Sequence, residues 1–228
     1  MADVLKYLFV SEKKWHDTLF YELQGKSGSI WIRCSSKEEF TVDYLDKLQP
    51  DLIFLPHWSY IIPNEIYSRF ECILFHMTNL PYGRGGSPLQ NLIVRGHKET
   101  FISAIRVAEG IDKGPIYLKA PLNLEGTAED IFIRAASVIK KMIIEIINTR
   151  PIPVKQTGKP VLFKRRKPEE SNIATLNNTA KIYDYIRMLD ANGYPKAFLE
   201  TEHFRFEFSK ASFENNDTIN ANVRIIKK

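Results

Sequence analysis

A histidine at the end of an apolar run is the first residue of this chain that could do chemistry. His76 closes the run CILF and is followed by the proline- and glycine-rich loop MTNLPYGRGGSP. Asp112 lies 36 positions later, in the stretch EGIDKG between two apolar segments. An imidazole exchanges protons near neutral pH, and a carboxylate beside it can hold its tautomer or polarise a water. The two residues predict a proton-transfer site if the fold brings them together.

Short apolar strands alternate with helices in the first third of the chain. Strands are expected at residues 4–10, 29–34, 51–55 and 72–76, with helices at 12–24, 36–48 and 63–67; Ser11 is expected to cap the first helix. This alternation predicts an α/β fold with a mostly parallel twisted sheet covered by helices on both faces. In such sheets ligands bind at the carboxyl ends of the strands, where both His57 and His76 fall.

The rest of the chain changes texture at about residue 151. Before that point we expect a short helix at 88–94, two strands at 101–107 and 115–120, and a long helix opened by Thr127 and ended by Pro151. The segment PIPVKQTGKPVLFKRRKPEES is then basic and interrupted by prolines. We place a domain boundary here, with a catalytic domain at 1–150 and a small C-terminal α+β appendage at 151–228. The appendage is expected to hold a helix at about 179–190, a strand at 197–208 and a final strand near NVRIIKK.

Composition narrows the classes of protein that the chain could represent. Of its residues, 44% are hydrophobic and 26% are charged, which is ordinary for a globular protein. The net charge of +5 fits a protein that handles anionic small molecules better than one that binds nucleic acid. Cys34 and Cys72 lie in apolar runs and are expected to be buried free thiols. No signal peptide or membrane-spanning stretch is visible, so we expect a cytoplasmic protein with no membrane partner.

Spacing alone leaves structural explanations open for each candidate. His76 could be satisfied by a backbone carbonyl, Asp112 could form a turn, and Arg84, between glycines, could be a solvated loop residue rather than a ligand for a carboxylate or phosphate. The chain has no Walker A loop, no G-x-S-x-G elbow and no zinc-ligand spacing.

The loop after His76 nevertheless resembles a known family. FHMTNLPYGRGGSPLQNLI resembles the signature loop of folate-dependent formyltransferases, and EGIDKGPIY resembles the stretch that carries the family's catalytic aspartate, here Asp112. HWSYIIP resembles the segment whose backbone holds the pterin ring, and PIPVKQTGKPVLF resembles a glutamine-containing segment of the family. The residues of the loop that fall in register are His76, Leu80, Pro81, Arg84, Gly85 and Pro88.

The resemblance implies a Rossmann-like formyltransferase core that uses N10-formyltetrahydrofolate as formyl donor, with no metal. His76 would then handle protons while an amine attacks the formyl carbon, and Asp112 would orient His76 or a water. The donor would be bound by residues of the two resembling segments, namely Trp58, Tyr60, Ile62, Arg84, Gly85 and Asp112.

One position departs from the family pattern. The family has a catalytic asparagine two residues before the histidine, and this chain has Leu74, which cannot donate a hydrogen bond. Asn79 could supply the missing amide, or His57 could supply a donor from the neighbouring strand end. Alternatively, the site could be an inactive remnant that binds folate without turnover. We expect Asn79 to be the replacement and the third catalytic residue.

The expected acceptor follows from the short C-terminal part. Methionyl-tRNA formyltransferases carry a substantial nucleic-acid-binding domain, whereas KIYDYIRMLDANGYPKAF resembles a segment of sugar N-formyltransferases. We therefore expect the acceptor to be a nucleotide-linked amino sugar of the 4-amino-4,6-dideoxy type, used in glycan biosynthesis, with no nucleic-acid partner and a possible homodimer. A methionyl-tRNA formyltransferase-like enzyme and a non-catalytic folate- or nucleotide-binding module remain the alternatives. The expected substrate-binding residues are His57, Thr78, Pro81, Tyr82, Lys164 and Arg187.

Overall fold

The structure, a computed structural model, describes residues 4–25 and 28–228. Its internal contacts divide the chain into two compact units that interleave along the sequence. The first comprises Met1–Gly85, Thr100–Leu122 and Ile133–Leu162, and the second comprises Gly86–Glu99, Asn123–Phe132 and Phe163–Lys228. The predicted division of the chain at residue 150 stays a prediction.

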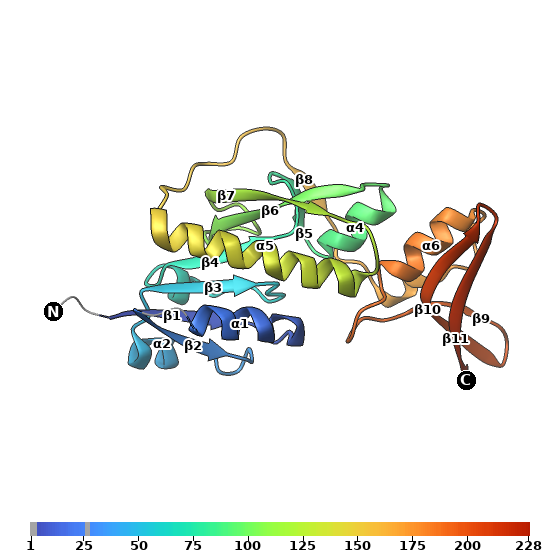
Figure 1. Ribbon diagram of the computed structural model, residues 1–228, viewed down its shortest axis with the longest axis horizontal. Coiled ribbons are helices and arrows are strands. Elements are labelled where there is room, and N and C mark those ends of the chain that lie inside the picture. The colour runs from blue at the N-terminus through green and yellow to red at the C-terminus, as the bar shows by residue number, and fades with distance from the viewer. Residues whose placement is uncertain (1–3, 26–27) are drawn as a thin grey trace. The chain divides into compact units, whose positions relative to one another are not determined.

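A six-stranded sheet forms the centre of the first unit (Figure 1). Strands β1 to β4 pair in parallel, and β6 pairs antiparallel with β4. The predicted α/β fold with a mostly parallel sheet is confirmed. In sheet order the strands are β2 (Ser29–Cys34), β1 (Leu5–Val10), β3 (Leu52–Pro56), β4 (Cys72–His76), β6 (Glu99–Arg106) and β7 (Ile116–Asn123).

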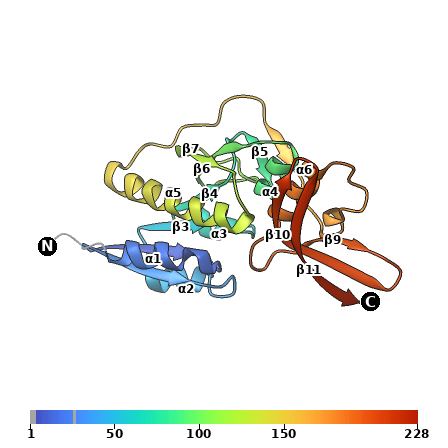
Figure 2. The ribbon, with the colours of Figure 1, turned by 45° about the vertical axis from the view of Figure 1, so that its right-hand side comes forward.

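Helices cover both faces of this sheet, as the sequence predicts. On one face lies α1 (Asp17–Gln24), preceded by the short 3₁₀ helix η1 (Lys14–His16), together with the part of α5 (Ala128–Thr149) that belongs to this unit (Figures 1 and 2). The other face is covered by α2 (Val42–Leu48) and α3 (Asn64–Tyr67).

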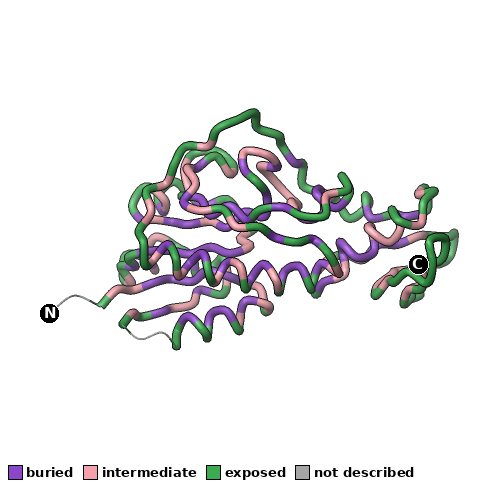
Figure 3. The backbone as a smooth tube through the Cα atoms, turned by 45° about the horizontal axis from the view of Figure 1, so that its top comes forward, coloured by how far each residue is buried: buried purple, intermediate pink, exposed green. Residues whose placement is uncertain are grey.

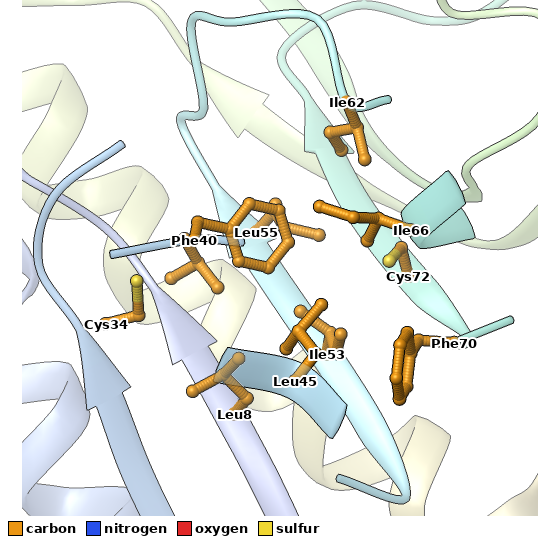
Figure 4. Packing of buried hydrophobic residues seen from close by; sticks show 11 residues of the cluster. Leu8, Cys34, Phe40, Leu45, Ile53, Leu55, Ile62, Ile66, Phe70 and Cys72 are labelled. Atoms are coloured by element: carbon orange, nitrogen blue, oxygen red, sulfur yellow. The ribbon is translucent and has the colours of Figure 1, made fainter. Parts of the chain in front are cut away.

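The face under α2 and α3 is closed by a cluster of buried apolar side chains (Figure 4). Alternate residues of the parallel strands contribute to it, because successive strand residues point to opposite faces. Burying one such side chain contributes about 1.5–3 kcal/mol. The cluster comprises Leu8, Val10, Cys34, Phe40, Leu45, Ile53, Leu55, Ile62, Ile66, Phe70 and Cys72.

Two predicted helix starts are wrong, in each case because a different residue satisfies the first turn. The predicted helix at 36–48 begins only at Val42, where the Thr41 hydroxyl accepts the Tyr44 N–H at 3.3 Å. The first helix is not capped by Ser11. The Ser11 hydroxyl instead lies 2.7 Å from Nδ1 of His16, and α1 begins after that histidine.

The second unit is a small α+β arrangement. Its antiparallel sheet has the order β11-β10-β9, and most residues of β10 and β11 are exposed (Figure 3). The predicted strand 197–208 is two strands separated by a turn, and the tail that looked largely polar forms a long hairpin. A homodimer through the last strand stays a prediction. The elements are α4 (Pro88–Val94), η2 (Pro168–Ser171), α6 (Thr179–Arg187), β9 (Ala197–Glu200), β10 (Phe204–Asn215) and β11 (Thr218–Lys227).

Two further expectations can be compared with the structure. Cys34 and Cys72 are buried and free, as predicted, and burial raises their pKa values to about 11 and about 12. No helix in the described part of the chain has both the length and the apolar composition needed to cross a membrane. The two-stranded sheet of β5 (Tyr82–Gly85) and β8 (Val161–Phe163) was not foreseen.

Truncation of Leu55 tests the cluster that supports the strand ends. Leu55 is fully buried, so Leu55→Ala removes its contacts and leaves a cavity. We expect the free energy of unfolding, measured by urea denaturation, to fall by about 2–5 kcal/mol. Ile133→Ala, which truncates a side chain 52% exposed on α5, is the matched control and should change it by less than about 0.5 kcal/mol. Equal losses in the two variants would contradict the assignment of the cluster.

Candidate active site

His76 ends β4 at the carboxyl edge of the sheet with a side chain that is 8% exposed. Its Nε2 atom lies 2.7 Å from the carbonyl oxygen of Gly83. A carbonyl can only accept a hydrogen bond, so Nε2 carries the proton. The bland alternative, a histidine bound to a backbone carbonyl, therefore describes one ring nitrogen. The other nitrogen, Nδ1, is left to face Asp112.

Asp112 lies in the connection between β6 and β7, and its Oδ2 atom is 3.6 Å from Nδ1 of His76. The predicted convergence of these two residues is confirmed, whereas their catalytic roles stay predictions. The same Oδ2 accepts the Gly85 N–H at 2.8 Å, which fixes the carboxylate. Asp112 has a left-handed backbone (φ +51°), and a Cβ at Gly114 would overlap the carbonyl oxygen of Arg106. The turn that presents the carboxylate is thus tightly constrained.

Gln156 holds this turn from outside. Its Nε2 donates to the carbonyl oxygens of Asp112 and Gly114, both at 2.8 Å. Its Oε1 accepts from the Arg84 guanidinium at 2.7 Å and 3.1 Å. Arg84, predicted to bind the donor, therefore spends two N–H groups on Gln156. Sequence reasoning noted the glutamine-containing segment but assigned no role to Gln156.

The loop after His76 is anchored by other buried hydrogen bonds. The Ser103 hydroxyl donates to the Thr78 carbonyl at 2.7 Å and accepts the Leu80 N–H at 3.3 Å. Thr78 is fully buried, so its predicted contact with substrate is replaced by a structural role. Pro81 follows a cis peptide bond, and Tyr82 begins β5; both are half-buried, and their predicted roles stay predictions.

Asn79 is exposed on this loop, and its amide does not lie on the His76–Asp112 pair in any contact that the structure records. Its Oδ1 accepts from Nζ of Lys119 at 2.6 Å, and the same ammonium donates to the Leu80 carbonyl at 2.6 Å. Burial lowers the pKa of Lys119. Lys119, which sequence reasoning missed, therefore ties the loop to β7. The expected catalytic role of Asn79 stays a prediction.

Two more histidines lie at the carboxyl ends of neighbouring strands. The ring of His57 lies 5.4 Å from Trp15 and 6.4 Å from His16, measured between centroids. Burial, with Lys13 adding a smaller effect, lowers the pKa of His57 to about 3, so this imidazole is neutral at physiological pH. Burial also lowers the pKa of His16 well below its ordinary value. His57 thus lies toward β1 in its recorded ring contacts, and its predicted binding role stays a prediction.

The segment predicted to hold the pterin ring leaves β3 next to His57. Trp58 is half-buried, Ile62 is 8% exposed within the apolar cluster, and Tyr60 donates its hydroxyl to Glu12 at 3.3 Å. The Ile62 side chain is part of the core, so any contact with a ligand would come from its backbone. Gly85, also predicted to bind the donor, uses its N–H on Asp112.

The two predicted binding residues of the second unit differ in exposure. Lys164 has an exposed side chain, and its carbonyl accepts from Asn91 at 2.9 Å. Arg187 is only 5% exposed; its Nε donates to Asp184 at 2.7 Å and its Nη1 to the carbonyls of Leu124 and Gly126. The structure gives Arg187 the role of an internal clamp. Among residues 4–25 and 28–228, no group of three or more metal-binding side chains is placed to hold an ion.

Two family models match the chain. Residues 12–147 match the formyl transferase model, and residues 168–226 match the model of the methionyl-tRNA formyltransferase C-terminal domain. The first match spans more than half of the chain and includes both His76 and Asp112.

Individual proteins give the same pattern. The solved structure of methionyl-tRNA formyltransferase from Clostridium thermocellum is 47% identical, covers 98% of this chain and 100% of its own, and has a TM-score of 0.95. Methionyl-tRNA formyltransferase from Campylobacter lari is 30% identical over 75% of this chain and 57% of its own length. The chain spans between 47% and 67% of the curated relatives compared here. A sugar N-formyltransferase from Shewanella shares the fold at 14% identity, with a TM-score of 0.69 over 88% of this chain and 94% of its own.

These matches contradict the expected acceptor and the expected absence of a nucleic-acid partner. The sugar N-formyltransferases share only the fold, whereas the relatives matched by sequence are named methionyl-tRNA formyltransferases. The expectation rested on the small size of the C-terminal part. That argument was wrong, because the same short segment matches the C-terminal domain model of the tRNA enzymes.

The depressed pKa of His57 predicts a specific acid sensitivity. In the unfolded chain this histidine gains a proton below about pH 6.5, whereas in the native state it stays neutral down to about pH 3. Its contribution to stability is therefore lost as the pH falls through this window. Between pH 7 and pH 5, urea unfolding should show a fall in stability that is smaller by up to ~2 kcal/mol in His57→Gln than in the native chain. His203→Gln, at an exposed position, should behave like the native chain; a His57→Gln curve that also matches it would refute the burial effect.

Proposed function

The chain belongs to the formyl transferase family, and on this premise we propose that it transfers a formyl group from a 10-formyltetrahydrofolate donor to the amino group of methionyl-tRNA. The observation that carries the proposal is the 47% identity to the Clostridium thermocellum methionyl-tRNA formyltransferase over essentially the full length of both chains. The match of residues 168–226 to the C-terminal domain model of such enzymes supports the same acceptor.

The geometry of the pair supports this chemistry. In the proposed reaction the acceptor nitrogen attacks the formyl carbon, and a C–N bond forms while the bond from that carbon to N10 of the folate breaks. The proton lost by the amine goes to Nδ1 of His76 and then to N10. Since Nε2 of His76 is tied to Gly83, the ring cannot turn away, and the imidazolium formed faces the Asp112 carboxylate at 3.6 Å. General acid–base catalysis of this kind contributes about 10²–10⁴-fold.

The direct test is a reaction of the purified chain with methionyl-tRNA and 10-formyltetrahydrofolate. Acid hydrolysis of the ester followed by mass spectrometry should show N-formylmethionine, formed only when donor, enzyme and charged tRNA are all present. Free methionine and methionyl-tRNA without donor are the controls. An enzyme that binds the donor but leaves methionyl-tRNA unmodified would contradict the proposal and favour a non-catalytic folate-binding module.

The roles of His76 and Asp112 predict the behaviour of two substitutions. His76→Gln retains a donor for the Gly83 carbonyl but removes the titrating nitrogen, so kcat should fall by about 10²–10⁴-fold. Asp112→Asn keeps an oxygen for the Gly85 N–H but loses the charge, and it should lower kcat with little change in melting temperature. His203→Gln serves as the control histidine variant. Native-like turnover in His76→Gln would remove this residue from the mechanism.

Gln156 is predicted to act as a positioning residue through the Asp112 turn. Gln156→Leu removes both hydrogen bonds to the turn and the partner of Arg84, so we expect kcat to fall at least about tenfold while KM for methionyl-tRNA changes less. Gln24→Leu, on the exposed end of α1, is the matched control. Steady-state kinetics separate the two parameters, and a rise in KM with unchanged kcat would assign Gln156 to binding instead.

A further inference from the structure

One buried hydrogen-bond donor at the carboxyl edge of the sheet has no partner in the described part of the chain. It is Nε1 of Trp58, the indole nitrogen of the second residue after β3. Leaving a buried N–H unsatisfied costs about 1–3 kcal/mol, so native proteins retain such groups mainly where a ligand or a water completes them. Trp58 also lies in the segment that leaves the strand next to β4, which carries His76.

The indole ring is held in a fixed orientation. It meets Phe40 at 5.6 Å and Tyr60 at 5.1 Å between centroids, both at angles close to perpendicular, and Phe40 is itself buried. Edge-to-face contacts on two aromatic neighbours restrict rotation of the ring. The N–H direction is therefore preorganised, which is the property that makes a donor effective toward charge developing in a transition state.

Register places Trp58 close to the level of His76 along the sheet. β3 and β4 run in parallel, and Pro56 stands opposite Phe75, so the chain leaves β3 beside the residue that ends β4. Trp58 and Leu74 pack against the same apolar cluster, on the face covered by α2 and α3. Trp58 therefore shares a face of the sheet with the position where this chain has lost a side-chain donor.

The reaction needs a donor that the pair itself does not offer. As the amine attacks, negative charge develops on the formyl oxygen and must be stabilised by hydrogen bonds. The Nε2–H of His76 is engaged by Gly83, and the N–H of Gly85 is engaged by Asp112. Leu74 has no polar atom. The Asn79 oxygen is held by Lys119.

From these observations we infer that the indole N–H of Trp58 donates to the formyl oxygen of the bound donor and thereby supplies the hydrogen bond that Leu74 cannot make. This inference rests on the proposed formyl transfer and adds a catalytic residue to it. No bond is made or broken at the indole: its N–H stays protonated throughout and strengthens its hydrogen bond as the oxygen gains charge.

The first test observes the indole directly and needs no acceptor. The chain contains three tryptophans, so a ¹⁵N-indole-labelled sample should give three Nε1–H signals, assigned by Trp58→Phe and Trp31→Phe. Adding 10-formyl-5,8-dideazafolate, a stable donor analogue, should move the Trp58 signal downfield more than the Trp31 signal. If the analogue binds, as judged by shifts elsewhere, and the Trp58 signal does not move, the inference is overturned.

The second test measures the catalytic effect. Trp58→Phe keeps an aromatic ring and deletes the N–H, so kcat for methionyl-tRNA should fall by about 10- to 100-fold while KM and melting temperature change little. Trp31→Phe, a buried ring on the opposite face, is the matched control. A kcat equal to that of the native chain, or a loss explained by a fall in melting temperature alone, would contradict the assignment.

Restoring a donor at position 74 provides the discriminating variant. Leu74→Asn in the Trp58→Phe background should recover at least part of the lost kcat, because it returns a hydrogen-bond donor to the same face; a purely structural loss at Trp58 would not be rescued. These outcomes are separable from failure of the proposed function. A shifted Trp58 signal without any N-formylmethionyl-tRNA would reject the acceptor and retain the indole contact, whereas turnover that is insensitive to Trp58→Phe would do the reverse.

Discussion

The site depends on a carboxylate held between three segments that are distant in the chain. Asp112 receives the Gly85 N–H on its side chain and the Gln156 amide on its backbone, while its free face meets the ring of His76. Each contact fixes a different degree of freedom: the position of the carboxylate, the path of the turn and the orientation of the imidazole. A buried carboxylate is tolerated only when its lone pairs are satisfied in this way, so the same bonds that permit its burial also aim it.

The three strand-end histidines show how environment divides similar residues into different roles. His16 and His57 lie among rings and a lysine, where burial lowers their pKa values and leaves neutral imidazoles. His76 is equally buried but has a carboxylate 3.6 Å from one nitrogen and a carbonyl on the other. A proton taken up by His76 thus meets a negative charge, whereas a proton on His57 would meet none of comparable proximity in the recorded contacts. Only the first arrangement is suited to receive a proton from an attacking amine.

Much of the fold and the central pair could be predicted from sequence because both are written in local patterns. Apolar runs give the strands, and His76 lies where a parallel sheet exposes strand ends. What sequence reasoning missed depends on contacts across long separations: Gln156 acts over 44 residues on Asp112, and Lys119 over 40 on Asn79. The helix start at Val42 and the Ser11–His16 contact were missed because tertiary partners replaced the expected caps. The acceptor was mistaken for a different reason, since domain size was taken as a measure of what the domain binds.

The protonation state of His76 is the most direct test of the account. ¹⁵N chemical shifts of the labelled imidazole, assigned with His76→Gln, report separately on Nδ1 and Nε2. The account predicts a protonated Nε2 at every pH at which the protein is folded, with only Nδ1 changing state on titration, because the Gly83 carbonyl can accept but not donate. A spectrum in which Nε2 is the unprotonated nitrogen of the neutral ring would contradict it.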